Sequence, residues 1–386
     1  MRILYVAPNI NHHQVPLVQE IMAIKGMEVI YAVQLLREEE RLNMGWQLYD
    51  EPWILEIDKN KEKFQKLFME SDVVICSVRD YHHLMSKRLQ NLKLTFYYTE
   101  RWFKIGIGEL GLYIKGISKL RLLHPKFIKI VLGFKKNSKY QNFYLLPQSE
   151  YAAKDFKFLG LCKNRIYNWG YFPEVSSHPA VENYFPKGKI NIFWCGRFLN
   201  WKRVDVLVKA FKIVTLKYSN VHLTLLGQGD CKDEIKTLSE KLLLSESITF
   251  MESVSSNKVR EIMNKADIYV LPSSGFEGWG AVINEAMAES CVVIGSNMTG
   301  AAKTIINDGI NGFIFSDGDY KSLASKIEQL LSNKELYNKL LKQSLTDINQ
   351  LWSPETAAKR LVAFCDANLK GESLPIYESG PLKLLF

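Results

Sequence analysis

The chain has 386 residues, of which 47% are hydrophobic and 24% charged, which suits two globular domains and excludes a disordered chain. The net charge of +9 favours anionic partners such as nucleotide sugars, anionic membrane surfaces or nucleic acid. The six cysteines are scattered and no run reaches the roughly 20 apolar residues of a membrane span, so we expect a cytoplasmic protein without a disulfide framework or a zinc site.

The N-terminal half alternates short apolar runs with helical patterns, which predicts an α/β domain with a parallel sheet. The loop over residues 8–14 follows the first strand and leads into a helix near Val15. Because ligands bind beyond the carboxyl ends of strands in such sheets, His12 and His13 of this loop are candidate site residues. Each histidine can equally be a loop residue that faces solvent. Strands are expected at residues 3–7, 27–33, 72–77, 94–98, 143–148 and 165–168, with a charged helical piece at 38–43.

The loop after the strand at 94–98 carries two charged side chains, Glu100 and Arg101. Glu100 can act as a base toward an acceptor hydroxyl, or it can simply pair with Arg101 or Lys104. The sequence leaves both interpretations open. We therefore keep Glu100 as a candidate catalytic residue, and both residues as candidates for the acceptor side of a site.

Residues 103–140 interleave basic side chains with Ile, Leu, Phe and Tyr. One interpretation is a basic amphipathic surface that rests on an anionic membrane, where a lipid-linked acceptor would lie; the other is an ordinary solvated helix face. We do not expect nucleic acid as a partner, because no recognised nucleic-acid-binding module accompanies the charge. The basic residues are Lys104, Lys115, Lys119, Arg121, Lys126, Lys129, Lys135, Lys136 and Lys139.

A stretch with three prolines and no apolar periodicity, residues 173–188, predicts a linker to a second α/β domain. The first strand of that domain, at 190–196, leads into a loop with Arg197 and Lys202. Such a pair of cations suits a diphosphate, because Arg grips phosphate oxygens with two hydrogen bonds and Lys adds a compact charge. Further strands are expected at 221–226, 248–253, 268–271 and 291–296, and helices at 204–218, 300–306, 322–331, 334–347 and 354–368.

One strand–loop–helix unit of the second domain carries two acids, Glu277 in the loop and Glu285 inside the helix that is expected from about Gly280. The amides of Gly278, Trp279 and Gly280 then fall where the start of a helix leaves donors unpaired, which suits a phosphate or another anion. The alternative is a structural helix with two solvated acids.

The spacing of Glu277 and Glu285 resembles the Glu-x7-Glu element of the retaining glycosyltransferases of family 4, which have the two-domain GT-B fold. The wider match begins at 191–198 and ends at 311–315, and it covers most of the C-terminal half in the right order. Where the family often has a Gly-rich loop after the first strand, this chain has His12 and His13.

The resemblance implies a fold of two Rossmann-like domains that face each other across a cleft. The N-terminal, acceptor-side domain is expected at 1–172 and the nucleotide-sugar-binding domain at 189–352, with the linker at 173–188. The remaining residues, 353–386, are expected to form a helix that crosses back to the N-terminal domain, followed by a tail about which the sequence says little.

The resemblance also implies an activity: transfer of a hexose from a UDP- or GDP-sugar to a saccharide or lipid-linked acceptor with retention of configuration. The expected setting is cell-surface polysaccharide synthesis, peripheral on the inner face of the plasma membrane. Arg197 and Lys202 would stabilise the departing diphosphate, assisted by the amides at 278–280. Glu277 would orient hydroxyls of the donor sugar, and Glu285 would hold the ribose.

No metal and no cofactor are expected beside the donor. Asp317 and Asp319 form an Asp-x-Asp pair, the metal site of another, single-domain glycosyltransferase fold, but here they precede a helix and favour a turn and a helix cap. Two alternative functions remain open: a nucleotide-sugar epimerase of the same fold, and a catalytically silent carbohydrate-binding subunit. An epimerase needs no acceptor. The silent subunit is disfavoured because four expected site residues are intact: Arg197, Lys202, Glu277 and Glu285.

Overall fold

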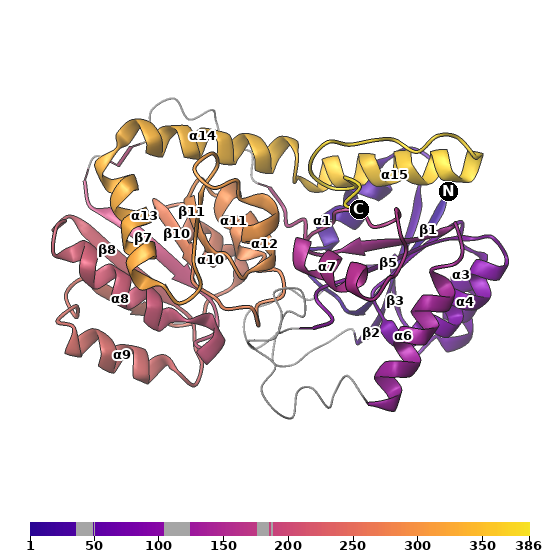
Figure 1. Cartoon of the computed structure of the whole chain (residues 1–386), viewed down its shortest axis with the longest axis horizontal. Coiled ribbons are helices and arrows are strands. Elements are labelled where there is room, and N and C mark those ends of the chain that lie inside the picture. Colours follow the sequence, from indigo (N-terminus) through magenta and orange to yellow (C-terminus); the bar gives the residue numbers. More distant parts are fainter. Residues whose placement is uncertain (36–48, 50, 104–123, 176–184, 187) are drawn as a thin grey trace. The chain divides into compact units, whose positions relative to one another are not determined.

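The computed structural model describes the whole chain except residues 36–48, 50, 104–123, 176–184 and 187 (Figure 1). The helical piece expected at 38–43, most of the expected linker and four residues of the basic stretch, Lys104, Lys115, Lys119 and Arg121, lie outside the described residues. The chain divides into two compact units. Unit 1 holds the described residues up to Pro173 together with Pro354–Phe386, and unit 2 holds those within Glu174–Ser353.

The described strands of unit 1 form one parallel six-stranded sheet in the order β3-β2-β1-β4-β5-β6. The central β1 lies between β2 and β4, with Leu4 opposite Ile30 on one side and Val74 on the other. The edge strand β3 was not expected from the sequence. The strands are β1 (Arg2–Asn9), β2 (Glu28–Leu35), β3 (Ile54–Glu56), β4 (Val73–Cys76), β5 (Leu94–Thr99) and β6 (Phe143–Pro147).

Helices cover both faces of this sheet. Neighbouring residues of a strand point to opposite faces, and in β5 the ring of Phe96 lies 5.6 Å from Phe364 of α15, whereas Tyr97 lies 4.5 Å from Phe134 of α6. Burial on both faces explains why the inner strands are apolar throughout instead of alternating. The helices are α1 (Val15–Ala23), α3 (Lys61–Glu70), α4 (His82–Gln90), α6 (Pro125–Asn137), α7 (Glu150–Phe158) and α15 (Pro354–Lys370), with a 3-10 turn at Arg79–Tyr81.

The C-terminal segment completes unit 1, which confirms the expected return of the last helix. Figure 1 shows α15 running beside α1, and the two helices are in contact. The residues after α15 also pack on unit 1: Leu382 is fully buried, and its amide donates to the carbonyl of Asn168 over 2.8 Å.

The strand expected at 165–168 is wrong in extent. These residues make only isolated bridges, in which Ile166 pairs with Leu145 of β6 on one side and Tyr167 pairs with Leu384 of the C-terminal segment on the other. Each of the two partners pairs with this segment at a single position, so a continuous strand does not form.

Unit 2 repeats the architecture with a parallel sheet of six described strands in the order β12-β11-β10-β7-β8-β9. Helix α8 packs against α9 and α13, and α11 packs against α10, α12 and α14. The strands are β7 (Ile190–Cys195), β8 (Val221–Leu226), β9 (Ile248–Met251), β10 (Ile268–Leu271), β11 (Val292–Ser296) and β12 (Phe313–Phe315). The helices are α8 (Val204–Thr215), α9 (Lys232–Lys241), α10 (Ser256–Met263), α11 (Val282–Ala288), α12 (Gly300–Ile305), α13 (Tyr320–Ser332) and α14 (Lys334–Gln350), with a 3-10 turn at Asn200–Lys202.

The turn-and-cap interpretation of the Asp-x-Asp pair is confirmed. Asp319 caps α13, because its carboxylate accepts hydrogen bonds from the amides of Lys321 and Ser322, each over 3.0 Å. Asp317 lies 3.7 Å from the guanidinium of Arg203. Within the ranges that the structure describes, the helices are all too short or too polar to cross a membrane.

Candidate active site

The strand order of unit 2 reverses between β7 and β10. From β7 the chain moves outward to β8 and β9, and from β10 it moves outward in the opposite direction to β11 and β12. Ligands of open α/β sheets bind beyond the carboxyl ends of the strands at such a reversal. The loop after β7 carries Arg197 and Lys202, and the loop after β10 carries Glu277. The topology therefore brings three of the predicted site residues to one place.

Lys202 and Glu277 form an ion pair in which Nζ of the lysine donates to Oε2 of the glutamate. The two loops are also joined through the backbone, because the amide of Ser274 donates to the carbonyl of Trp201 over 2.8 Å. The lysine side chain is 18% exposed and the glutamate side chain 15%. Each charge is therefore largely removed from water and holds its partner in place.

The charges around Glu277 keep it ionised. Burial pushes its pKa upward, but the charge and the hydrogen bond of Lys202, together with the charge of Arg197, outweigh burial and leave the pKa below its ordinary value. The three side chains then carry two positive charges and one negative charge at neutral pH. This local excess of positive charge suits a diphosphate.

The loops after β7 and β8 lie backbone against backbone. Gly227 has a φ of 139°, and a Cβ atom there would lie 1.9 Å from the carbonyl oxygen of Gly196. Gly229 has a φ of 144°, and a Cβ atom there would lie 2.6 Å from the carbonyl oxygen of Phe198. Glycine is needed at both positions because the neighbouring backbone leaves no room for a side chain. The loop that carries Arg197 therefore rests directly on the loop after β8.

Helix α11 begins at Val282, slightly later than the sequence indicates, because Gly280 adopts a φ of 86° that ends the loop before the helix. The amides of Gly278, Trp279 and Gly280 therefore precede the helix instead of forming its first turn. Their part in anion binding stays a prediction. The indole of Trp279 is 1% exposed and donates to Oδ1 of Asn284 over 2.9 Å, so this side chain anchors the loop to α11.

Glu285 lies on α11 in a buried environment. Burial raises its pKa to about 7; the attraction of Arg260 opposes the rise and the charge of Glu289 adds to it. Burial is the largest cause that raises the pKa of the Cys195 thiol, at the end of β7, and the negative charge of Glu285 is the second largest. Glu285 is therefore close to the same strand end from which the Arg197 loop departs.

Unit 1 has its own reversal of strand order, between β1 and β4, and the loop after β1 carries His12 and His13. The two imidazole rings lie 3.7 Å apart, and the ring of His13 lies 5.9 Å from that of Tyr171. The hydroxyl of Tyr171 donates to Oε1 of Glu100 over 3.2 Å. Tyr171, which the sequence analysis missed, thus connects three of the four acceptor-side candidates.

Arg101, the fourth acceptor-side candidate, is only 8% exposed. Its guanidinium lies 4.6 Å from the centroid of the Tyr151 ring. Burial raises the pKa of Asp155 to about 6, and the positive charge of Arg101 opposes this rise. Asp155 in turn accepts the amides of Trp102 and Phe103 over 3.1 and 3.2 Å. The surroundings of Arg101 thus tie it to the folding of its own loop, and its part in acceptor binding stays a prediction.

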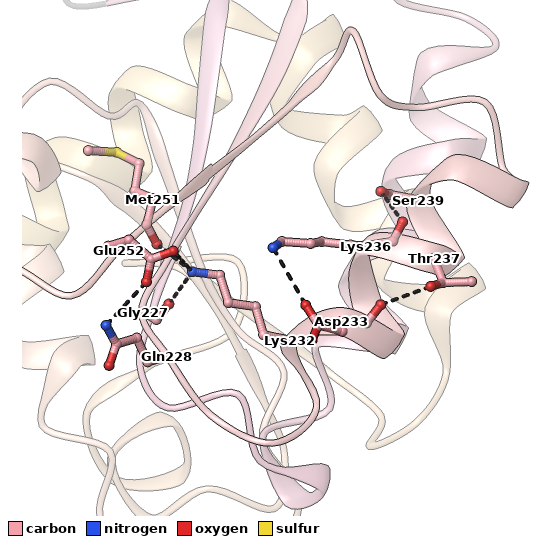
Figure 2. A network of polar contacts seen from close by, with 9 residues as sticks. All are labelled: Gly227, Gln228, Lys232, Asp233, Lys236, Thr237, Ser239, Met251 and Glu252. Carbon is pink, nitrogen blue, oxygen red and sulfur yellow. Dashed lines mark hydrogen bonds and ion pairs between the residues drawn. The ribbon is translucent and has the colours of Figure 1, made fainter.

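A buried lysine in unit 2 also escaped the sequence analysis. Lys232 is the first residue of α9, and its Nζ donates to the carbonyls of Gly227 and Met251 and to Glu252, over 2.8, 3.2 and 2.7 Å (Figure 2). A cation at the N-terminus of a helix opposes the helix dipole. A lysine at this position is therefore a signal in the sequence that the side chain has another partner.

Comparisons with known proteins agree with this geometry. Residues 180–345 match the family described as "Glycosyl transferases group 1". A capsular polysaccharide biosynthesis glycosyltransferase, CapM of Staphylococcus aureus, is 33% identical over 145 residues, which are 38% of this chain and 37% of that protein. A phosphatidyl-myo-inositol mannosyltransferase of Mycobacterium leprae is 31% identical over 163 residues, 42% of each chain. This chain thus spans half or less of the length of these curated relatives.

Solved structures match over nearly the whole chain. HepE of Anabaena in complex with UDP has a TM-score of 0.67 and 13% identity, covering 96% of this chain and 100% of that one. WaaG, a glycosyltransferase of lipopolysaccharide biosynthesis, has a TM-score of 0.61 and 15% identity, covering 92% and 98%. At these identities the likeness establishes the fold, which is the expected GT-B fold of two Rossmann-like domains.

Proposed function

We propose that the chain transfers a hexose from a nucleotide-diphosphate sugar to a saccharide or lipid-linked acceptor, because residues 180–345 match the family described as "Glycosyl transferases group 1". The observation that carries the proposal is the partly buried ion pair of Lys202 and Glu277, beside Arg197, at the strand-order reversal of unit 2. Two cations and one fixed carboxylate beyond the carboxyl ends of β7 and β10 suit a ligand that has both phosphates and hydroxyls.

Each of these side chains has a proposed role. Arg197 and Lys202 bind the diphosphate and stabilise the negative charge that grows on it as the bond to the sugar breaks. Glu277 accepts hydrogen bonds from hydroxyls of the donor sugar, and the ion pair with Lys202 fixes its orientation before the donor arrives. Glu285 accepts hydrogen bonds from the ribose.

We propose that the configuration of the sugar is retained. The acceptor oxygen bonds to the anomeric carbon on the face that the diphosphate leaves, the bond from that carbon to the phosphate oxygen breaks, and its electron pair stays on the phosphate. The proton of the acceptor hydroxyl passes to that leaving phosphate. On the acceptor side, His12, His13 and Glu100 of unit 1 are the candidates that position the incoming hydroxyl, with Tyr171 fixing Glu100.

The named relatives support a role in the synthesis of cell-surface polymers or glycolipids. They are the capsular polysaccharide enzyme and the phosphatidyl-myo-inositol mannosyltransferase. Because HepE was solved with UDP, we propose a UDP-sugar as the first donor to test, with GDP-sugars next.

The test begins with UDP, GDP, ADP and dTDP in a thermal-shift measurement, because a ligand that binds the native state raises the melting temperature. The diphosphate that binds then selects the sugar donors for a transfer assay, with product stereochemistry read by proton NMR. Epimerised donor without an acceptor would favour the epimerase alternative. Absence of binding by every nucleotide would contradict the proposal.

We further propose that α6 rests on an anionic membrane. Ile130 and Phe134 of this helix are buried, whereas Ile128 and Leu132, one turn apart, are 41% and 60% exposed. Lysines surround this exposed apolar pair at positions 126, 129, 135, 136 and 139. The arrangement suits a helix that lies in the plane of the lipid headgroups.

A liposome flotation assay tests this contact. Binding to anionic vesicles should fall with salt, and the double substitution of Lys135 and Lys136 to Gln should weaken it by about 2 kcal/mol, or about 30-fold. The substitution of Lys212 and Lys217 of unit 2 to Gln is the charge-matched control. Equal binding to neutral and anionic vesicles would show that α6 is only a solvated helix face.

A further inference from the structure

Lys232 is unusual because a buried lysine uses its ammonium group mainly on the backbone of two loops. Its side chain is 10% exposed, and two of its three acceptors are the carbonyls of Gly227 and Met251, which follow β8 and end β9. The third acceptor, Glu252, is 69% exposed. Figure 2 shows the side chain extending from the first turn of α9 to these acceptors. One ammonium group thus fastens the carboxyl ends of two neighbouring strands.

The fastened loop supports in turn the loop that carries Arg197. The amide of Phe198 donates to the carbonyl of Gln228 over 2.8 Å, and the carbonyl of Phe198 accepts the amide of Cys231 over 3.0 Å. The amide of Gly196 donates to the carbonyl of Leu226 over 3.0 Å. Both neighbours of Arg197 in the sequence are therefore hydrogen-bonded to the segment that Lys232 holds.

The ring of Phe198 makes a second connection. The Nζ atom of Lys232 lies 5.7 Å from its centroid, within the range of a cation–π contact. Because Gly227 and Gly229 leave no space between the two loops, a displacement of the loop after β8 must move the backbone on either side of Arg197.

We infer that Lys232 is a positioning residue, which acts through the loop after β8 to hold Arg197 where the diphosphate of the donor binds. The inference rests on the proposed function, since it assigns the diphosphate to Arg197. It assigns Lys232 no contact with the donor. Loss of the ammonium group should therefore weaken the recognition of the diphosphate and leave the recognition of the nucleoside unchanged.

The test is a double-mutant cycle in the full chain, with calorimetric affinity for UDP, or for GDP if it binds more tightly, as the readout. Lys232→Met keeps most of the apolar stem and removes the donors. It should weaken binding about tenfold in the parent and less than twofold in an Arg197→Ala background, because coupled contacts are not additive. The affinity for uridine or guanosine, followed by ligand-observed NMR, should not change.

Lys236→Met is the matched control, because Lys236 lies on the same helix and makes a surface ion pair with Asp233 over 3.5 Å. It should leave both affinities unchanged in both backgrounds. If Lys232→Met does not fold, Lys232→Arg replaces it in the cycle, since a planar guanidinium cannot reproduce the three donor directions of the ammonium group. Its smaller loss should likewise vanish in the Arg197→Ala background.

An equal loss of affinity in both backgrounds, or an equal loss for nucleoside and diphosphate, would overturn the inference, because Lys232 would then act on the fold as a whole. An unchanged affinity of Lys232→Met for the diphosphate would overturn it as well. A parent protein that binds none of UDP, GDP, ADP and dTDP would overturn the proposed function together with this inference, whereas the outcomes above overturn the inference alone.

Discussion

The carboxyl group of Glu285, on a partly buried side chain, allows a sharp prediction about pH. Its pKa is raised from an ordinary value of 4.5 to about 7, with burial as the main cause. A raised pKa means that the folded protein holds the proton more tightly than the unfolded chain, so this group stabilises the fold most at low pH. The contribution is complete below about pH 4.5 and is lost as the pH rises through about 7.

The size of the effect follows from the shift. A change from 4.5 to about 7 corresponds to about 3 kcal/mol of free energy of unfolding, which is an upper value because the side chain is partly exposed. Glu285→Gln keeps the size of the side chain and never ionises. The variant should therefore be more stable than the parent at pH 8, and this gain should shrink toward pH 5. Urea denaturation followed by fluorescence at both pH values measures the difference.

Nucleotide binding should depend on pH in the opposite direction to the stability contribution of Glu285, and should be tighter at high pH. If ribose hydroxyls donate to Glu285, the carboxylate form binds, and acidification from pH 8 to pH 5.5 should weaken the affinity of the parent about 30-fold. Because the terminal phosphate of UDP also titrates near pH 6, the comparison is with Glu285→Gln, which retains only that phosphate effect. Calorimetry at pH 6 in buffers of different ionisation enthalpy should detect nearly one more proton released by the parent. Identical pH profiles of the parent and Glu285→Gln would refute the assignment of the ribose to Glu285.

Three further predictions concern the charged centre. Lys202→Ala should lower turnover about 100–1000-fold and nucleotide affinity much less, because the lysine acts most on charge that develops as the diphosphate leaves; equal losses in both, measured by calorimetry beside steady-state kinetics, would contradict this. Glu277→Gln should leave the affinity for free diphosphate nearly intact and depress transfer, and a variant with unchanged turnover would remove Glu277 from the donor-sugar site. Transfer should survive EDTA, since cations of the protein neutralise the diphosphate; activity lost to EDTA and restored by magnesium would show that a metal is required.

Five of the six described strands of unit 2 were expected from the sequence because their signals are local, whereas β12 and the helices α9 and α10 were not expected. The strand at 268–271 is an unbroken apolar run, and its bounds are those of β10. The sequence also placed Lys202 and Glu277 in loops after two strands. It did not show that these strands are neighbours, although the pairing of β7 with β10 is what brings the two side chains together. Only the resemblance to a known family supplied that adjacency.

What the sequence missed depends on contacts between distant residues. The segment at 165–168 was expected to be a strand, yet one of its two pairing partners is Leu384, far along the chain. The part of Tyr171 depends on a hydrogen bond to Glu100, and that of Lys232 on two backbone carbonyls. Any residue type can supply a backbone carbonyl, so the sequence does not identify which acceptors Lys232 uses.

The return of the C-terminal segment to unit 1 has a consequence for biosynthesis. Helix α15 contacts α1 and Leu382 is fully buried in unit 1, whereas the residues that form unit 2 are made in between. At about 5–20 residues per second, the ribosome needs roughly 10 to 40 s for that intervening stretch. During this time the face of the first sheet that α15 will cover is without its helix, although the six described strands of that sheet have already been made. Unit 1 is therefore made first but completed last, and the apolar face that α15 covers stays exposed to aggregation until residues 354–386 have been made.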